Sequence, residues 1–76
     1  MSFYEYMMHY PHDIPERLAL AENMKKMAPR HKELREIDSM MDLFLAERYL
    51  TDDEAAKGIT GSLWCEYCIA CNRPIN

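Results

Sequence analysis

Hydrophobic side chains recur every three or four residues along most of the chain, which is the spacing of one helix face. The first such group precedes Pro11 and comprises Phe3, Tyr6, Met7 and Tyr10. Because proline disfavours continuation of a helix, we predict a first helix over residues 3–10. No segment of useful length alternates between apolar and polar residues, so the pattern predicts an all-α protein.

The next two predicted helices flank Pro29, which favours a break in the chain. One runs from about residue 14 to 27, and its narrow apolar stripe comprises Ile14, Leu18, Ala21 and Met24. The other runs from about residue 32 to 48, and its expected core face comprises Leu34, Ile37, Met41, Phe44 and Leu45. Leu43 falls on the opposite side of this helix. We therefore expect it at the surface, where it could contact a partner.

The last part of the chain begins a helical segment at Thr51. Gly58 and Gly61 either divide this segment into a short turn and a final helix, or allow another backbone to approach closely. Residues 61–71 follow a helical pattern again, and residues 72–76 are expected to form a frayed end.

Helix-start signals support the same organisation. In a capping box, a short oxygen-bearing side chain stands three residues before a Glu. The pattern occurs at Ser2 with Glu5, Asp13 with Glu16, and Thr51 with Glu54. We predict a compact bundle of four or five short helices in one domain, residues 1–76, with its folded part at about 2–71. The expected core comprises Phe3, Tyr6, Met7, Leu18, Ile37, Met41, Phe44, Leu63, Trp64 and Tyr67.

Charge is unevenly distributed along the chain, which has a net charge of −4. Five of the 9 basic residues fall in one segment: Lys25, Lys26, Arg30, Lys32 and Arg35. The overall acidity argues against non-specific binding to a phosphate backbone, whereas the basic segment keeps a small nucleic-acid or acidic-partner contact open. Cationic side chains near a helix C-terminus also have an ordinary explanation, because they complement the helix dipole.

All three cysteines lie in the stretch WCEYCIACNR, at Cys65, Cys68 and Cys71. They are weak candidates for a metal site, because zinc needs four converging ligands and no second cysteine pair follows. No Gly, Pro or Asn lies between the cysteines to form the turn of a zinc knuckle. We predict a helix that carries free thiols, with Cys71 the most buried and Cys65 the most exposed.

The chain contains no phosphate-binding glycine loop and no nucleophile elbow. The acidic run Asp52, Asp53 and Glu54 lacks the spacing of a calcium loop, and a helix N-terminus explains it. We therefore expect no enzymatic activity, no cofactor and no small-molecule substrate. Because no apolar run approaches the roughly 20 residues of a membrane span, and the N-terminus has no secretory signal, we expect a cytoplasmic protein without a membrane contact.

Several stretches together resemble the YozE-type family of small bacterial proteins. They are SFYEYMM from residue 2, LALAENM from 18, APRHK from 28, EID from 36, MMDLFL from 40 and LWCEY from 63. The resemblance covers roughly residues 2–67 and implies a SAM-like (sterile-alpha-motif-like) helical domain. The family occurs in low-GC Gram-positive bacteria, and similar proteins occur in their phages. It has no established enzymatic activity, and a nucleic-acid-binding role has been suggested from its fold.

Two functions follow as hypotheses. The first is a small protein-binding or regulatory module, for example a phage-encoded anti-defence inhibitor that acts in the host cytoplasm. Its expected contact residues are Asp42, Leu43, Asp52, Asp53 and Glu54. The alternative is a nucleic-acid-binding module that uses the basic segment over residues 25–35, which the net charge disfavours.

Overall fold

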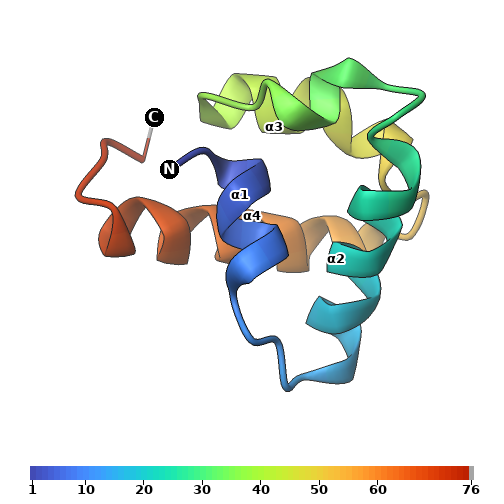
Figure 1. Ribbon diagram of the computed structural model, residues 1–76, viewed down its shortest axis with the longest axis horizontal. Coiled ribbons are helices and arrows are strands. Elements are labelled where there is room, and N and C mark those ends of the chain that lie inside the picture. Colours follow the sequence, from blue (N-terminus) through green and yellow to red (C-terminus); the bar gives the residue numbers. More distant parts are fainter. Residues whose placement is uncertain (76) are drawn as a thin grey trace.

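The computed structural model describes residues 1–75, which form helices and no strands. Its elements are α1 (Phe3–His9), α2 (Pro15–Met27), the 3-10 helix η1 (Lys32–Arg35), α3 (Met40–Ala46), the 3-10 helix η2 (Glu47–Tyr49) and α4 (Glu54–Ala70). Figure 1 shows the long helix α4 crossing the molecule, α1 in front of its middle, α2 at one end and α3 above. The predicted all-α fold is confirmed.

Helix α1 begins as the sequence predicts. The Ser2 hydroxyl accepts a hydrogen bond from the Glu5 N–H (3.1 Å), and the Glu5 carboxylate accepts one from the Ser2 N–H (2.9 Å). These two bonds satisfy backbone donors that have no partner inside the helix, and they hold the pKa of Glu5 below its usual value. The buried face of the helix is Phe3, Tyr6 and Met7.

Four aromatic rings join α1 to α4 and form the centre of the core. The centroid of the Phe3 ring lies 5.4 Å from that of Trp64 and 5.5 Å from that of Tyr67. Tyr6 lies 5.4 Å from Tyr67. Tilted and edge-on pairs at these distances add favourable ring electrostatics to the burial of large apolar surfaces. Trp64, Tyr67 and Phe3 are fully buried, as predicted.

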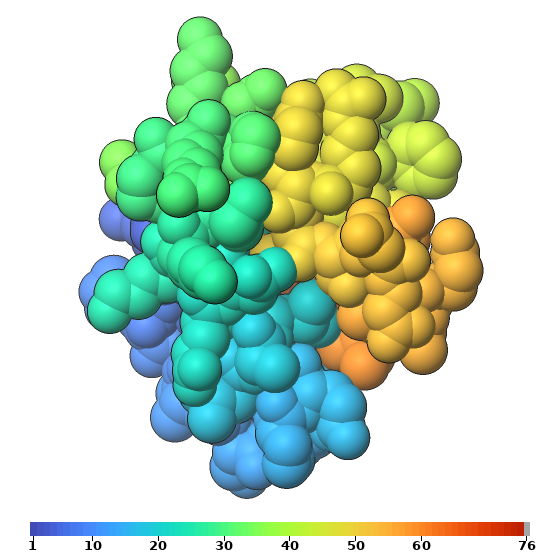
Figure 2. All heavy atoms as spheres, turned by 90° about the vertical axis from the view of Figure 1, so that its right-hand side faces the viewer, coloured from blue at the N-terminus to red at the C-terminus, as the bar shows by residue number. Residues whose placement is uncertain are grey.

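Helix α2 has its predicted length but a different buried face. Its N-cap is Ile14, without a side-chain cap, so the capping box expected at Asp13 and Glu16 is wrong. Leu18, expected in the core, is 45% exposed, and Ile14 is exposed as well. The residues that α2 buries are Leu20, Ala21 and Met24. Figure 2 shows the face of the molecule on which α2 lies, with the green segment after it above and the start of α4 beside it.

The side of α2 that carries Arg17 also carries its buried residues Leu20, Ala21 and Met24. The Arg17 guanidinium donates two parallel hydrogen bonds to the Glu66 carboxylate, at 2.9 and 2.6 Å. This two-point contact raises the pKa of Arg17 and joins that side of α2 to α4. Leu18, one residue further along, therefore points elsewhere, because successive residues of a helix are turned by about 100°.

The single helix expected over residues 32–48 is wrong. The chain forms η1, leaves helical geometry after Arg35, and starts α3 at Met40. The Ser39 hydroxyl accepts a hydrogen bond from the Asp42 N–H (3.1 Å), and the Asp42 carboxylate accepts one from the Asp38 N–H (3.0 Å). A short side-chain cap thus starts a new helix after a non-helical linker.

The new start changes which residues face the core. Leu43, expected at the surface, is 2% exposed, and Ala46 and Leu50 are buried with it. Met41 and Phe44, expected in the core, are 64% and 68% exposed, and Leu45 is 60% exposed. The apolar spacing that suggests one long helix therefore runs across two shorter elements that are not in phase.

Helix α4 is continuous from Glu54 to Ala70, so Gly58 and Gly61 do not divide it. A Cβ atom built at either glycine meets nothing within 4 Å, so no other backbone approaches there. The N-cap is Asp53, whose carboxylate accepts a hydrogen bond from the Ala55 N–H (3.1 Å), and the box expected at Thr51 and Glu54 does not form. The buried face of the helix comprises Thr60, Leu63, Trp64, Tyr67 and Cys68.

Replacing Trp64 by Ala should remove about 3–5 kcal/mol from the free energy of unfolding, because a fully buried side chain leaves a cavity. That loss approaches the whole stability of so small a domain, which is commonly about 5–15 kcal/mol. Thermal and urea denaturation followed by circular dichroism would measure it. Leu18→Ala, at a half-exposed position, is the control and should change stability little. A Trp64→Ala protein that melts like the wild type would contradict the assigned core.

Candidate functional site

Three large apolar side chains of α3 lie together at the surface. Met41, Phe44 and Leu45 are spaced as i, i+3 and i+4, so they neighbour one another on one face of the helix. We call these three residues the α3 patch. Met40, which is half-buried, and Ser39 extend it into a shallow apolar hollow that Met41 and Phe44 also line. Single exposed apolar residues are ordinary, whereas a contiguous group makes this face of α3 a candidate contact surface.

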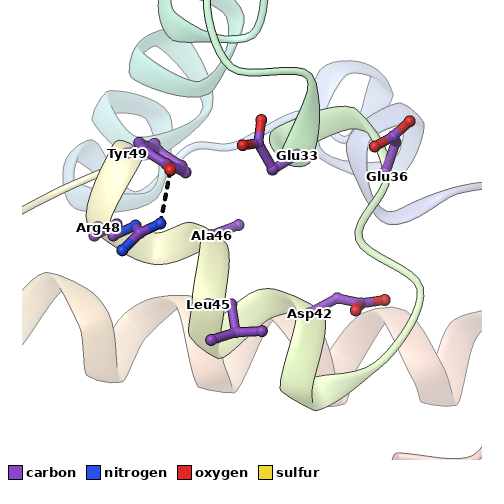
Figure 3. Close-up of a pocket in the computed structure, with 7 residues that line it drawn as sticks. All are labelled: Glu33, Glu36, Asp42, Leu45, Ala46, Arg48 and Tyr49. Carbon is purple, nitrogen blue, oxygen red and sulfur yellow. Dashed lines mark hydrogen bonds between the residues drawn. The ribbon is translucent and has the colours of Figure 1, made fainter.

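An acidic hollow adjoins the α3 patch (Figure 3). It has a volume of about 350 Å³ and is lined by three carboxylates, those of Glu33, Glu36 and Asp42, together with Leu45, Arg48 and Tyr49. The carboxylates come from η1, the linker after it and α3. Leu45 belongs to both surfaces, so the apolar and acidic surfaces are continuous.

Arg48 is the cationic side chain that lines the acidic hollow, and it contacts Tyr49. Its guanidinium donates a hydrogen bond to the Tyr49 hydroxyl (2.8 Å) and lies 4.8 Å from the centre of the Tyr49 ring. The Tyr49 ring also stacks on the His31 ring, with the two ring centroids 4.1 Å apart. Within residues 1–75, Glu33 and Glu36 make no ion pair.

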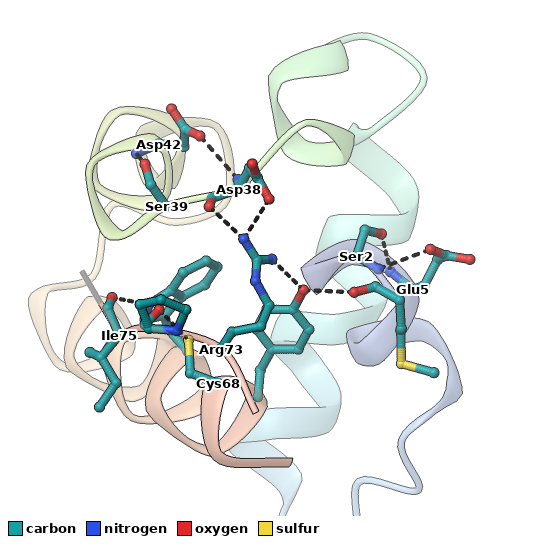
Figure 4. A network of polar contacts seen from close by, with 12 residues as sticks. Ser2, Glu5, Asp38, Ser39, Asp42, Cys68, Arg73 and Ile75 are labelled. Carbon is teal, nitrogen blue, oxygen red and sulfur yellow. Dashed lines mark hydrogen bonds and ion pairs between the residues drawn. The ribbon is translucent and has the colours of Figure 1, made fainter. Parts of the chain in front are cut away.

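The position of α3 is fixed by the chain's C-terminal segment (Figure 4). Arg73 donates hydrogen bonds to the Asp38 carboxylate (2.6 Å), to the Asp38 carbonyl (2.9 Å) and to the Tyr67 hydroxyl (2.6 Å). Asp38 precedes the Ser39 cap directly, so these bonds hold the linker from which α3 starts. Tyr67 in turn donates to the Met1 carbonyl (2.7 Å), which ties down the N-terminus.

The expectation of a frayed end is wrong for residues 72–75, and residue 76 lies outside the described residues. Asn72 adopts a positive φ of 54°, and the Arg73 N–H donates to the Cys68 carbonyl (2.8 Å), which ends α4 in a Schellman turn. The turn sends the chain back over the helix, where the Trp64 indole N–H donates to the Ile75 carbonyl (2.7 Å).

The structure separates the acidic residues expected to contact a partner. Asp42 lines the acidic hollow beside the α3 patch. Asp52 is exposed before α4, Asp53 caps that helix, and Glu54 lies 3.5 Å from the Lys57 ammonium group. Leu43, expected in the same contact, is buried and cannot take part.

The five basic residues are all exposed, at the end of α2 and in the segment through η1: Lys25, Lys26, Arg30, Lys32 and Arg35. Arg35 lies over the Tyr4 ring, with its guanidinium carbon 5.6 Å from the ring centre. Glu33 stands within this segment and Glu36 directly follows it, so the basic surface borders the acidic hollow.

The cysteines lie on α4 and at its C-cap, and the helix predicted for this stretch is confirmed as far as Ala70. Cys68, and not Cys71, is the most buried thiol, because it lies on the buried face of α4, where its Sγ is 3.5 Å from the Pro74 carbonyl oxygen. Burial raises the pKa of the Cys68 thiol. Cys65 and Cys71 are half-buried. Over residues 1–75, no group of three or more His, Cys, Asp or Glu side chains is placed to hold a metal ion.

The fold and this surface define a small all-α domain with an exposed apolar helix face beside an acidic hollow. No family model, no curated protein and no solved structure matches the chain. The resemblance to the YozE-type family therefore stays a prediction. Within the described part of the chain, no helix combines the length and the apolar character needed to cross a membrane.

Maleimide labelling should separate the thiols, because the reactive species is an accessible thiolate. We expect Cys65 and Cys71 to react in the native protein and Cys68 to react after denaturation. Mass spectrometry of peptides from labelled protein would assign each site. Rapid labelling of Cys68 under native conditions would show that the C-terminal segment does not cover it.

Proposed function

We propose that this protein is a small non-enzymatic protein-binding module and that it binds its partner through the α3 patch. The observation that carries the proposal is the exposure of Met41, Phe44 and Leu45, each at 60% or more. A chain of 76 residues needs most of its large apolar side chains for its core. Leaving three of them together at the surface forgoes roughly 25 cal/mol for each Å² that burial would remove from water.

The way α3 is held supports a binding role. Leu43 and Ala46 anchor the inner face of the helix in the core, the Ser39 cap fixes its start, and Arg73 holds the preceding linker. A helix face fixed in this way loses little conformational freedom on binding, so more of the contact energy appears as affinity. An apolar helix face with i, i+3 and i+4 side chains is also a common element of peptide recognition.

A narrower form of the proposal is a phage-encoded inhibitor of a host defence protein. Such an inhibitor would act by covering a surface of its target with the α3 patch, which requires contact and no chemistry. The small size and the net charge of −4 are compatible with this role.

Nucleic-acid binding through the basic segment is the second candidate, and the exposure of all five basic side chains favours it. The net charge of −4 opposes approach to a phosphate backbone. The adjoining carboxylates of Glu33 and Glu36 oppose it locally. We therefore rank this function second.

Affinity capture with matched variants would test the proposal. Phe44→Glu should remove the partner that the wild-type protein retains, while the fold persists because Phe44 is 68% exposed. Leu18→Glu introduces glutamate at an apolar residue outside the α3 patch that is 45% exposed, and this variant should retain the partner. Melting curves of both variants would verify folding.

A partner retained equally by wild type and Phe44→Glu would overturn the assignment of the α3 patch. Loss of binding in Lys25→Glu/Lys32→Glu instead, with release of the bound material by nuclease and by salt, would establish the nucleic-acid function in its place.

A further inference from the structure

We propose that the α3 patch and the acidic hollow together bind a basic amphipathic helical segment of the partner protein. This inference rests on the proposed function and adds the chemistry of the partner. Apolar side chains of the segment would cover Met41, Phe44 and Leu45. A Lys or Arg side chain of the same segment would enter the acidic hollow.

The two surfaces are positioned to be used together. Leu45 lines the acidic hollow and belongs to the α3 patch, and Asp42 lines the hollow from the same helix. A helix that covers Leu45 therefore brings its neighbouring positions to the edge of the hollow. Residues three and four apart in a helix share a face, so one segment can present an apolar side chain to the patch and a cation to the hollow.

The charge of the hollow selects the sign of the ligand. Three carboxylates and one guanidinium line the hollow, and that guanidinium is bonded to the Tyr49 hydroxyl. No cation within residues 1–75 forms an ion pair with Glu33 or Glu36. A cationic side chain beside apolar contacts, where water is partly excluded, would gain from these charges, whereas an anionic segment or a phosphate backbone would be repelled.

The size of the patch selects a segment over a globular surface. Three side chains offer on the order of a few hundred Å², the size of common functional patches. A stable interface between folded proteins needs about 800 Å² from each partner.

Pairing with a second copy of this chain through the same face is disfavoured. Two-fold pairing uses the same surface on both copies. Pairing through the α3 patch would bring two acidic hollows towards one another, which costs energy through like-charge repulsion. A short basic amphipathic helix needs less contact area than a folded partner, and its charge is opposite to that of the acidic hollow.

A synthetic peptide would test the inference with a defined probe. The peptide has about four helical turns, leucines on one face and lysines on the other, and blocked ends. Its control carries glutamate in place of every lysine. Isothermal titration should show binding of the lysine peptide to the wild-type protein, with an affinity that falls as salt rises, and at least tenfold weaker binding of the glutamate peptide.

Variants of this protein separate the specific site from general charge attraction. Glu33→Lys/Glu36→Lys should weaken binding of the lysine peptide at least tenfold, and so should Phe44→Glu. Glu22→Lys/Asp13→Lys makes the same change in net charge at two exposed acids outside the hollow, and it should leave the affinity within about twofold. Melting curves would show that each variant is folded.

Three results would overturn the inference. The first is equal affinity of the wild-type protein for the lysine and glutamate peptides. The second is an equal loss of affinity for the lysine peptide in Glu33→Lys/Glu36→Lys and in its charge-matched control. The third is absence of lysine-peptide binding to the wild-type protein. None of these results affects the capture experiment. Suppose that, in the capture experiment, a partner is lost in Phe44→Glu and retained by Glu33→Lys/Glu36→Lys. That result would support protein binding through the α3 patch and contradict the inference that the partner presents a basic segment.

Discussion

The hydrogen bond between the Asp42 N–H and the Ser39 hydroxyl is the contact on which the rest of this surface depends. It fixes the residue at which α3 begins, and each later residue is turned about 100° from the one before. With this start, Leu43 and Ala46 face the core, while Met41, Phe44 and Leu45 face outward. Burial of Leu43 and Ala46 holds the helix in this rotation, and the cap lets the helix begin at Met40 after a non-helical linker. Together they leave the α3 patch at the surface.

The cap works because the linker before it is held from a distance. Arg73 binds Asp38, 35 residues away, and also binds the Tyr67 hydroxyl in the aromatic core. The Arg73–Asp38 pair is partly exposed, and such pairs commonly contribute less than about 1 kcal/mol. Its importance is positional: it connects the C-terminal segment, α4 and the start of α3, so the patch is presented by a fixed helix.

The sequence predicts the elements whose signals are local. The Ser2–Glu5 cap and the spacing of Phe3, Tyr6 and Met7 define α1, and the same reasoning identifies Trp64 and Tyr67 as core. Sequence reasoning fails between Ile37 and Leu45. The apolar residues there keep the spacing of one helix although they belong to two structural elements. Ser39 followed three residues later by Asp42 is a readable cap that would have corrected this error. The α3 patch consists of residues that the pattern assigns to the core, whereas Asp42 of the acidic hollow is one of the expected contact residues. The Arg73 contacts with Asp38 and Tyr67 depend on the folded chain.

Methionine oxidation tests the orientation of α3 most directly. Met41 is 64% exposed, Met24 is fully buried, and Met1, at 69%, provides an exposed reference in the same chain. Dilute peroxide followed by peptide mass spectrometry would give the rate at which each becomes the sulfoxide. The account predicts that Met41 reacts at a rate close to that of Met1, and that Met24 stays protected until the protein unfolds. Protection of Met41 to the level of Met24 would contradict it, because Met41 would then face the core and the α3 patch would not exist.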